Sequence, residues 1–214
     1  MNDLTAVDVL VDPDETTLRH AHAWNARMRE SVPDGFALDA SHRPHITTLQ
    51  RYVRTADLDD VYDAVHRTLA ATDTSALSYQ AVAVKHADWG VPGQGLAVIL
   101  LRPGPQVLDF QAALLAALAP FTRSGGTAAA FVTDPGEAIS DSTLDWVDGY
   151  VPAQIGPDRY TAHITVGFAT LDDLEAIEAE PFDAFAVRPA GVAVYQLGNS
   201  GAARTLLRSW PVPN

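Results

Sequence analysis

The tripeptide His-Ile-Thr occurs twice in this sequence, as His45-Ile46-Thr47 and His163-Ile164-Thr165. Each copy lies in a short run of β-branched and apolar residues that predicts a β-strand. Side chains alternate between the two faces of a strand, so each histidine shares a face with the threonine two residues later, while the isoleucine points into the core. Each copy therefore presents one imidazole and one hydroxyl together.

The surroundings of the two copies are also alike. Each copy is followed by Leu-Asp-Asp, at 58–60 and 171–173, which opens an amphipathic run and places acidic residues where the helix dipole favours them. Upstream, residues 9–13 resemble residues 99–103, and each segment precedes a helical pattern of apolar residues. These patterns are Leu18, Ala21, Trp24 and Met28 in the first copy, and Leu108, Ala112, Leu115 and Leu118 in the second. The sequence predicts a duplicated unit of strand, helix, motif strand, helix and strand.

The two copies differ in length. We expect a single bilobal domain over residues 1–214, with a first repeat at about 4–92 and a second at about 93–214. From Pro13 to His45 there are 32 residues, whereas from Pro103 to His163 there are 60, so the second repeat carries about 28 more. Most of them fall in an insertion at about 122–160, rich in glycine and proline turn signals. A lid over the site and a packed structural hairpin are both consistent with this insertion.

Composition limits the class of protein. A 214-residue chain that is 47% hydrophobic can bury one core or two small lobes, and the absence of cysteine leaves no disulfide or thiolate metal site. The N-terminus lacks the features of a signal peptide, and the longest apolar run is too short for a membrane span, so we expect a soluble cytoplasmic protein.

Charge limits the partner. The net charge of −13 opposes broad binding to a nucleic-acid backbone, which argues against DNA and long RNA. Arginines nevertheless flank the motifs, namely Arg43, Arg51, Arg54 and Arg159. These either decorate exposed strand ends or form a local pocket for a phosphate. A small nucleotide or an RNA end fits this balance, and neither a membrane nor an obligate protein partner is inferred.

Two imidazoles and two hydroxyls suit acid–base chemistry at a phosphodiester. Histidine titrates near neutral pH, and a neutral hydroxyl donates to an anionic oxygen. We expect no metal, because His42 lies three residues before His45 and points to the other face of an extended chain. No cofactor is implied either, since the sequence contains neither a Walker pattern nor a serine nucleophile elbow.

The two motifs in their duplicated setting, Pro44-His45-Ile46-Thr47 and Ala162-His163-Ile164-Thr165, together with residues 194–198, resemble the 2H phosphoesterase superfamily. This superfamily includes the 2'-5' RNA ligase-like proteins and cyclic phosphodiesterases, with their HxTx motifs. The resemblance implies an α+β fold of two pseudo-symmetric lobes, each an antiparallel-rich sheet with helices outside, and a central cleft where the motifs meet. Ala162 stands where the family often has proline, which affects strand entry more than chemistry.

The resemblance also implies an activity. It predicts a metal-independent phosphodiesterase acting on 2',3'-cyclic or 2'-5' phosphodiesters of nucleotides or RNA ends, as in RNA processing. His45 and His163 would be the acid and base, in an order that sequence symmetry hides, and Thr47 and Thr165 would donate to the phosphate. ATP-independent 2'-5' RNA ligation and a non-catalytic phosphate or RNA-end binding module remain alternatives.

Residues beside the motifs are candidates for substrate binding. The arginines could pair with the phosphate, and the tyrosines could stack a nucleobase, although aromatic residues in strands also serve packing. The candidates for substrate binding are Arg43, Arg51, Tyr52, Arg159, Tyr160 and Tyr195.

Overall fold

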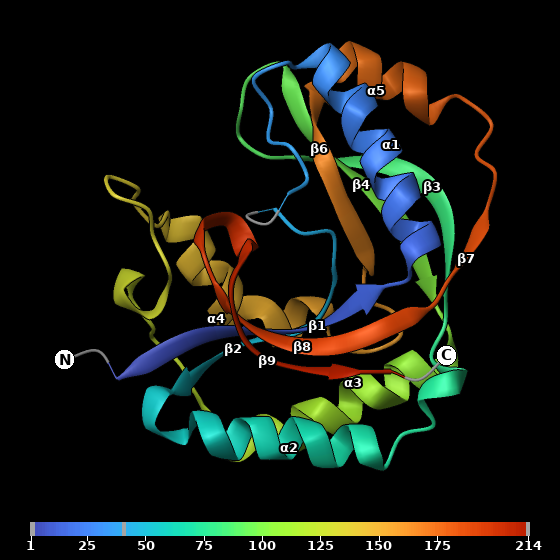
Figure 1. Cartoon of the computed structure of the whole chain (residues 1–214). Coiled ribbons are helices and arrows are strands. Elements are labelled where there is room, and N and C mark those ends of the chain that lie inside the picture. Colours follow the sequence, from blue (N-terminus) through green and yellow to red (C-terminus); the bar gives the residue numbers. More distant parts are fainter. Residues whose placement is uncertain (1–2, 40–41, 213–214) are drawn as a thin grey trace.

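The computed structural model describes residues 3–39 and 42–212, so the outermost residues of the expected 1–214 domain lie outside it. Strands and helices alternate through most of the chain (Figure 1). The strands are β1 (Leu4–Pro13), β2 (Ile46–Arg54), β3 (Tyr79–Asp88), β4 (Gln94–Pro103), β5 (Thr122–Arg123), β6 (His163–Thr170), β7 (Phe185–Val187), β8 (Pro189–Leu197) and β9 (Ala203–Pro211). The main helices are α1 (Glu15–Ser31), α2 (Leu58–Ala70), α3 (Pro105–Leu118), α4 (Asp141–Gln154) and α5 (Leu171–Glu178).

The strands form two antiparallel sheets, which confirms the predicted α+β class. The first sheet has the order β5-β2-β1-β8-β9 and the second the order β6-β4-β3-β7. Each sheet takes strands from both halves of the sequence, because β3 pairs with β4 and β8 pairs with β1. The two motif strands, β2 and β6, therefore lie in different sheets.

The helices pack outside the sheets, as expected. Each sheet is covered by helices from both halves of the sequence, just as each sheet takes strands from both halves. In Figure 1, α2 and α3 lie side by side under the first sheet, while α1 and α5 cover the second. Helix α1 approaches β6 closely at Gly167, where an added Cβ would lie 2.9 Å from Cβ of Met28. The positive φ of Gly167, 139°, also favours glycine at this position.

The buried faces of α1 and α3 differ from the predicted apolar stripes. In α1 the buried residues are Thr17, Ala21, Asn25 and Met28, and in α3 they are Val107, Phe110, Gln111, Leu114 and Leu118. Trp24 and Leu18, predicted to face the core, are only half-buried. A buried amide thus lies on each helix, where the sequence pattern indicated hydrophobic packing.

The strand register relates the two repeats residue by residue. Thr47 lies opposite Leu10 of β1, and Thr165 lies opposite Val98 of β4. The match of residues 9–13 with 99–103 predicted that Leu10 corresponds to Leu100. The register shows instead that Leu10 corresponds to Val98. The offset is two residues, so side chains stay on the expected faces, because strand side chains alternate with a period of two.

The 122–160 insertion contains β5 and α4 and packs against the first sheet. Helix α4 lies on β2, with Val147 and Tyr150 buried. Upstream of α4, Gly126 lies so close to the ring of Tyr52 that an added Cβ would be 2.2 Å from a ring carbon. The insertion is thus a packed element that supports the first motif strand.

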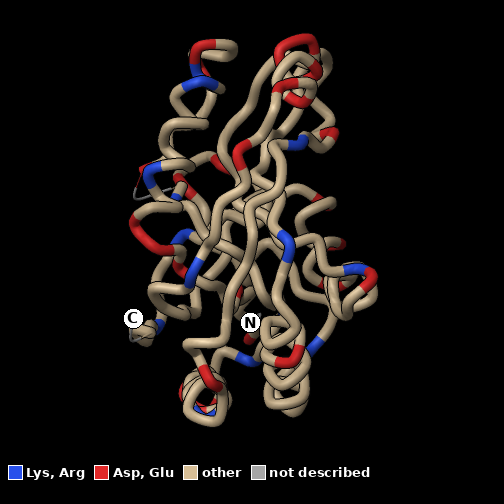
Figure 2. The backbone as a smooth tube through the Cα atoms, turned by 90° about the vertical axis from the view of Figure 1, so that its right-hand side faces the viewer, with Lys and Arg blue, Asp and Glu red and all other residues tan. Residues whose placement is uncertain are grey.

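Charged residues lie mainly on helices and loops, and the strands through the middle of the molecule carry few of them (Figure 2). Within the described part of the chain, no helix combines the length and the apolar character that a membrane span requires.

Candidate active site

Each His-Ile-Thr motif stands at the start of a strand and is followed by the same irregularity. His45 directly precedes β2, and His163 is the first residue of β6. One residue after each motif threonine is unpaired in the ladder, Thr48 in β2 and Val166 in β6. Such a bulge bends a strand and changes the direction of its side chains. The duplicated sequence has therefore produced duplicated local geometry.

The two imidazoles are held in the same way. Nδ1 of His45 lies 2.7 Å from the carbonyl oxygen of Arg43, and Nδ1 of His163 lies 2.8 Å from that of Thr161. A carbonyl oxygen only accepts, so Nδ1 carries the hydrogen in both rings. In the neutral ring, Nε2 is then the nitrogen with a free lone pair, and it is the one that can exchange a proton with a ligand.

The fold brings the two motifs together. The Tyr160 hydroxyl, just before the second motif, donates a 2.8 Å hydrogen bond to the carbonyl oxygen of Thr47 in the first. Burial lowers the pKa of His163, and the nearby positive charge of His45 lowers it further, against the opposing effect of its bond to Thr161. The two histidines are therefore close enough to interact electrostatically, and His163 favours the neutral state.

A buried carboxylate, missed in the sequence analysis, lies under the first motif. Asp8 of β1 is fully buried, and its Oδ2 accepts hydrogen bonds from Oγ1 of Thr47 at 2.8 Å and from Nε2 of Gln50 at 3.2 Å. The same oxygen lies 3.8 Å from Nε2 of His45. Burial raises the pKa of Asp8, and the charge of His45 and the two hydrogen bonds oppose this. The available signal was a charged residue in the middle of the otherwise apolar run 6–11.

Among the residues that the structure describes, the second motif has no such carboxylate. Asp8 lies two residues before Leu10, so the strand register matches it to Leu96, which is apolar. The Thr165 hydroxyl has no hydrogen-bond partner among the described residues, whereas the Thr47 hydroxyl donates to Asp8. The two motifs share their backbone geometry and differ in their electrostatics.

The buried amide of α1 holds backbone from both halves of the site. Nδ2 of Asn25 donates to the carbonyl of Val166, the bulge residue after the second motif, at 2.9 Å. It also donates to the carbonyl of Phe36 at 3.0 Å, and its Oδ1 accepts from the amide of Leu38 at 3.0 Å. Phe36 and Leu38 belong to the loop that leads to the first motif, so one side chain links the two motifs.

The buried amide of α3 makes the equivalent set of contacts in the other repeat. Nε2 of Gln111 donates to the carbonyl of Thr48, the bulge residue after the first motif, at 3.1 Å. It also donates to the carbonyl of Gln154 at 3.2 Å, and its Oε1 accepts from the amide of Gly156 at 3.3 Å. Residues 154–156 lead toward the second motif. We call Asn25 and Gln111 the amide clamps.

Comparisons with known proteins find matches among solved structures at low sequence identity. No family model and no curated protein matches the chain. Among solved structures, E. coli LigT complexed with phosphate matches at 12% identity over 99% of both chains, with a TM-score of 0.48. Kluyveromyces marxianus Usb1 matches at 6% identity over 99% of both chains, with a TM-score of 0.44. At such low identity we infer function from the side-chain geometry described above.

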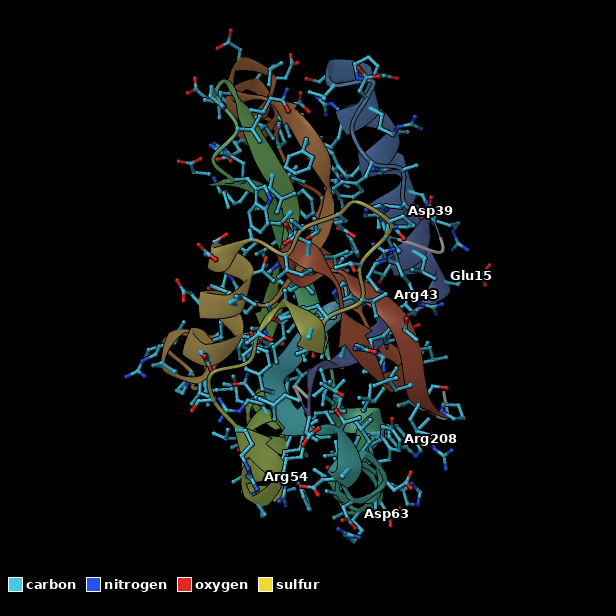
Figure 3. The ribbon with its side chains drawn as sticks, turned by 90° about the vertical axis from the view of Figure 1, so that its left-hand side faces the viewer. Glu15, Asp39, Arg43, Arg54, Asp63 and Arg208 are labelled. Atoms are coloured by element: carbon cyan, nitrogen blue, oxygen red, sulfur yellow. The ribbon has the colours of Figure 1, made fainter. Side chains whose placement is uncertain are left out.

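The predicted arginines lie at three separate places. Arg43 is exposed and pairs with Asp12 at 3.1 Å; Figure 3 shows it on the side of the molecule that also carries Glu15 at the start of α1. Arg51 is half-buried, with Nε 3.4 Å from Oγ1 of Thr122, and burial lowers its pKa. Arg159 is exposed and donates to a carbonyl on α4. Only Arg43 has a backbone carbonyl in contact with a motif histidine.

The predicted tyrosines are enclosed by protein. Tyr52, Tyr160 and Tyr195 are 1%, 8% and 7% exposed. The Tyr52 hydroxyl donates to the carbonyl of Leu144 in α4, and its ring packs edge-on against Phe131. Such low exposure favours packing, the alternative for aromatic residues in strands, over stacking on a nucleobase. Tyr160 instead connects the two motifs through its hydroxyl.

Neither a metal cluster nor either of the following two hollows coincides with the motifs in the described part of the chain. Among the residues described, no three His, Cys, Asp or Glu side chains gather as a potential metal cluster. A hollow of about 460 Å³ lies between α2 and α3, and one of about 210 Å³ lies beside Trp24 and Phe182. Neither hollow is lined by a motif residue.

Proposed function

We propose that this protein is a metal-independent phosphodiesterase of the 2H type that hydrolyses 2',3'-cyclic or 2'-5' phosphodiesters of nucleotides or RNA ends. The observation that supports this most is the pair of imidazoles, each fixed through Nδ1 and each left with Nε2 to exchange a proton. Phosphodiester hydrolysis needs one group to take a proton from water and another to give a proton to the leaving oxygen. Two adjacent histidines supply both.

The hydrolysis of a 2',3'-cyclic phosphate follows from these groups. One imidazole accepts a proton as the water oxygen bonds to phosphorus. The bond from phosphorus to one ribose oxygen breaks, and the second imidazole protonates that oxygen. Thr165 donates to a non-bridging phosphate oxygen, because its hydroxyl is uncommitted, whereas the Thr47 hydroxyl is already used by Asp8.

Arg43 is the candidate cation for the phosphate. It is exposed, it is two residues from His45, and its guanidinium can bind a phosphate as well as Asp12. A local cation of this kind on a chain with net charge −13 favours a small anionic ligand over a long nucleic-acid backbone.

The test is an assay of EDTA-treated protein on 2',3'-cyclic AMP, CMP, GMP and UMP, with 2'- and 3'-phosphate products resolved. His45→Ala and His163→Ala should each lower the rate by about 10²- to 10⁴-fold while the fold is retained. His22→Ala is the matched control, since His22 lies exposed on α1. Near-full activity in either motif variant would refute the assignment. Absence of turnover in wild type, extended to 2'-5' linked oligonucleotides and RNA ends, would favour the binding-module alternative.

A further inference from the structure

Asp8 is the buried charged group that the two-histidine mechanism does not use. It is fully buried in β1, and its Oδ1 has no hydrogen-bond partner within the described chain. Its Oδ2 lies 3.8 Å from Nε2 of His45, which is the nitrogen left free for chemistry. Because the second motif has Leu96 at the matching position, Asp8 makes two otherwise similar motifs unequal.

We propose that Asp8 sets the direction of proton transfer, so that the Asp8–His45 pair gives the proton to the leaving oxygen and His163 takes the proton from water. This inference rests on the proposed phosphodiesterase function and names the roles that the sequence leaves open. Asp8 is a positioning residue, since it acts on His45 and does not touch the substrate.

The reason is the cost of isolated charge in a buried site. A buried carboxylate without a counter-charge is unfavourable, and an adjacent imidazolium or a proton on the carboxyl lowers that cost. Besides the hydrogen on Nδ1 of His45, the Asp8–His45 pair therefore holds one ionisable proton, which reaches the leaving oxygen from Nε2 of His45. A second proton on His163 is disfavoured by burial and by the charge of His45, both of which lower the pKa of His163.

Protons then move in one direction, from water to His163 and from His45 to the leaving oxygen. Nε2 of His163 accepts a proton from the water whose oxygen bonds to phosphorus. As the bond between phosphorus and the ribose oxygen breaks, Nε2 of His45 gives its proton to that oxygen. His163 ends protonated and the Asp8–His45 pair ends one proton poorer, and exchange with solvent restores both.

Within the described ranges, the other ionisable groups around the pair do not offer another proton donor near neutral pH. Tyr150 of α4 has its pKa raised by burial and by Asp8, and Tyr195, opposite Asp8 in β8, also has a raised pKa from burial. Both phenols stay neutral where histidine titrates. Arg43 and Asp12 near Tyr195 are paired with each other.

The first test varies the leaving group. A p-nitrophenolate group leaves without being protonated, so the loss of a general acid matters little for bis(p-nitrophenyl) phosphate. His45→Ala should lower the rate on 2',3'-cyclic AMP by about 10²-fold or more. On bis(p-nitrophenyl) phosphate the fold-loss of rate in this variant should be about 10 times smaller. His163→Ala should be equally defective on both substrates. Rescue of His163→Ala instead, or equal behaviour of the two variants, would overturn the assignment.

The second test is Asp8→Asn, which keeps the shape and removes the carboxylate. The basic limb of the pH–rate profile should move to lower pH, because the pair then loses its proton more easily. Asp172→Asn removes the same charge from an exposed position at the start of α5 and should leave both limbs in place. A basic limb unmoved in folded Asp8→Asn would refute the role of Asp8. If this variant does not fold, the leaving-group test still decides the order of the histidines.

A measurement without substrate separates this inference from the proposed function. NMR titration of the ligand-free protein should show His163 losing its proton at a lower pH than the Asp8–His45 pair. The reverse order would overturn the inference even in an active enzyme. The expected order in a protein with no turnover would support the inference about Asp8 and count against the phosphodiesterase.

Discussion

The Asn25 clamp gives a quantitative prediction about how the site is held together. Asn25→Ala removes three hydrogen bonds, to the carbonyls of Val166 and Phe36 and from the amide of Leu38, all 2.9 to 3.0 Å long. At about 1 kcal/mol net for each bond, the free energy of unfolding should fall by about 3 kcal/mol. For a chain of this size the loss corresponds to a fall in Tm of about 6–12 °C.

Activity should fall as well, because the lost bonds position the bulge after the second motif and the loop before the first. A displacement of about 1 Å at a catalytic group costs up to about 10²-fold in rate. We would measure Tm by circular dichroism and kcat on a 2',3'-cyclic nucleotide well below Tm, with exposed His22→Ala as the control. A Tm change of less than about 2 °C relative to the control, equivalent to less than about 1 kcal/mol, would refute the clamp.

Three further predictions follow from the same structure. Because burial and the charge of His45 lower the pKa of His163 below 6.5, and a base works only when neutral, the acidic limb of kcat/KM should lie below pH 6.5; a limb at or above that value would contradict this. Thr165→Val should lower kcat by about 10²-fold and Thr47→Val by less, as a side-by-side assay would show, because only the Thr165 hydroxyl is uncommitted. Gly126→Ala should destabilise by about 1–3 kcal/mol in urea unfolding through its contact with Tyr52, whereas Gly149→Ala in α4, which meets no atom within 4 Å, should not.

The motif strands and the fold class could be predicted from the sequence because their signals are local and repeated. The two His-Ile-Thr runs stand out by alternation and by their shared surroundings, and the acidic residues of 58–60 and 171–173 do lie in first helical turns. Periodicity of this kind depends only on neighbours within a few residues, so it survives without any knowledge of tertiary contacts.

The residues that hold the site together could not be predicted in this way. Asn25 and Gln111 are polar, so the apolar patterns that predict the buried faces of α1 and α3 do not include them. Both are nevertheless buried, because they form hydrogen bonds to backbone more than 60 residues away. Asp8 was missed for the same reason, since its role depends on contacts with Thr47 and His45 from a distant part of the sequence. Long-range polar partners leave no periodic signal in the sequence.

The exchange of strands and helices between the two sheets has a consequence for the integrity of the chain. Cutting the hairpin between β3 and β4, at 89–93, would give two fragments with one motif each. The fragment with His45 would lack Gln111, and the fragment with His163 would lack Asn25, so each would be without the clamp on its own bulge. Activity should then return only on mixing, with a rate that depends on the concentrations of both pieces. A single repeat could have formed such a site only by pairing with a second copy of itself.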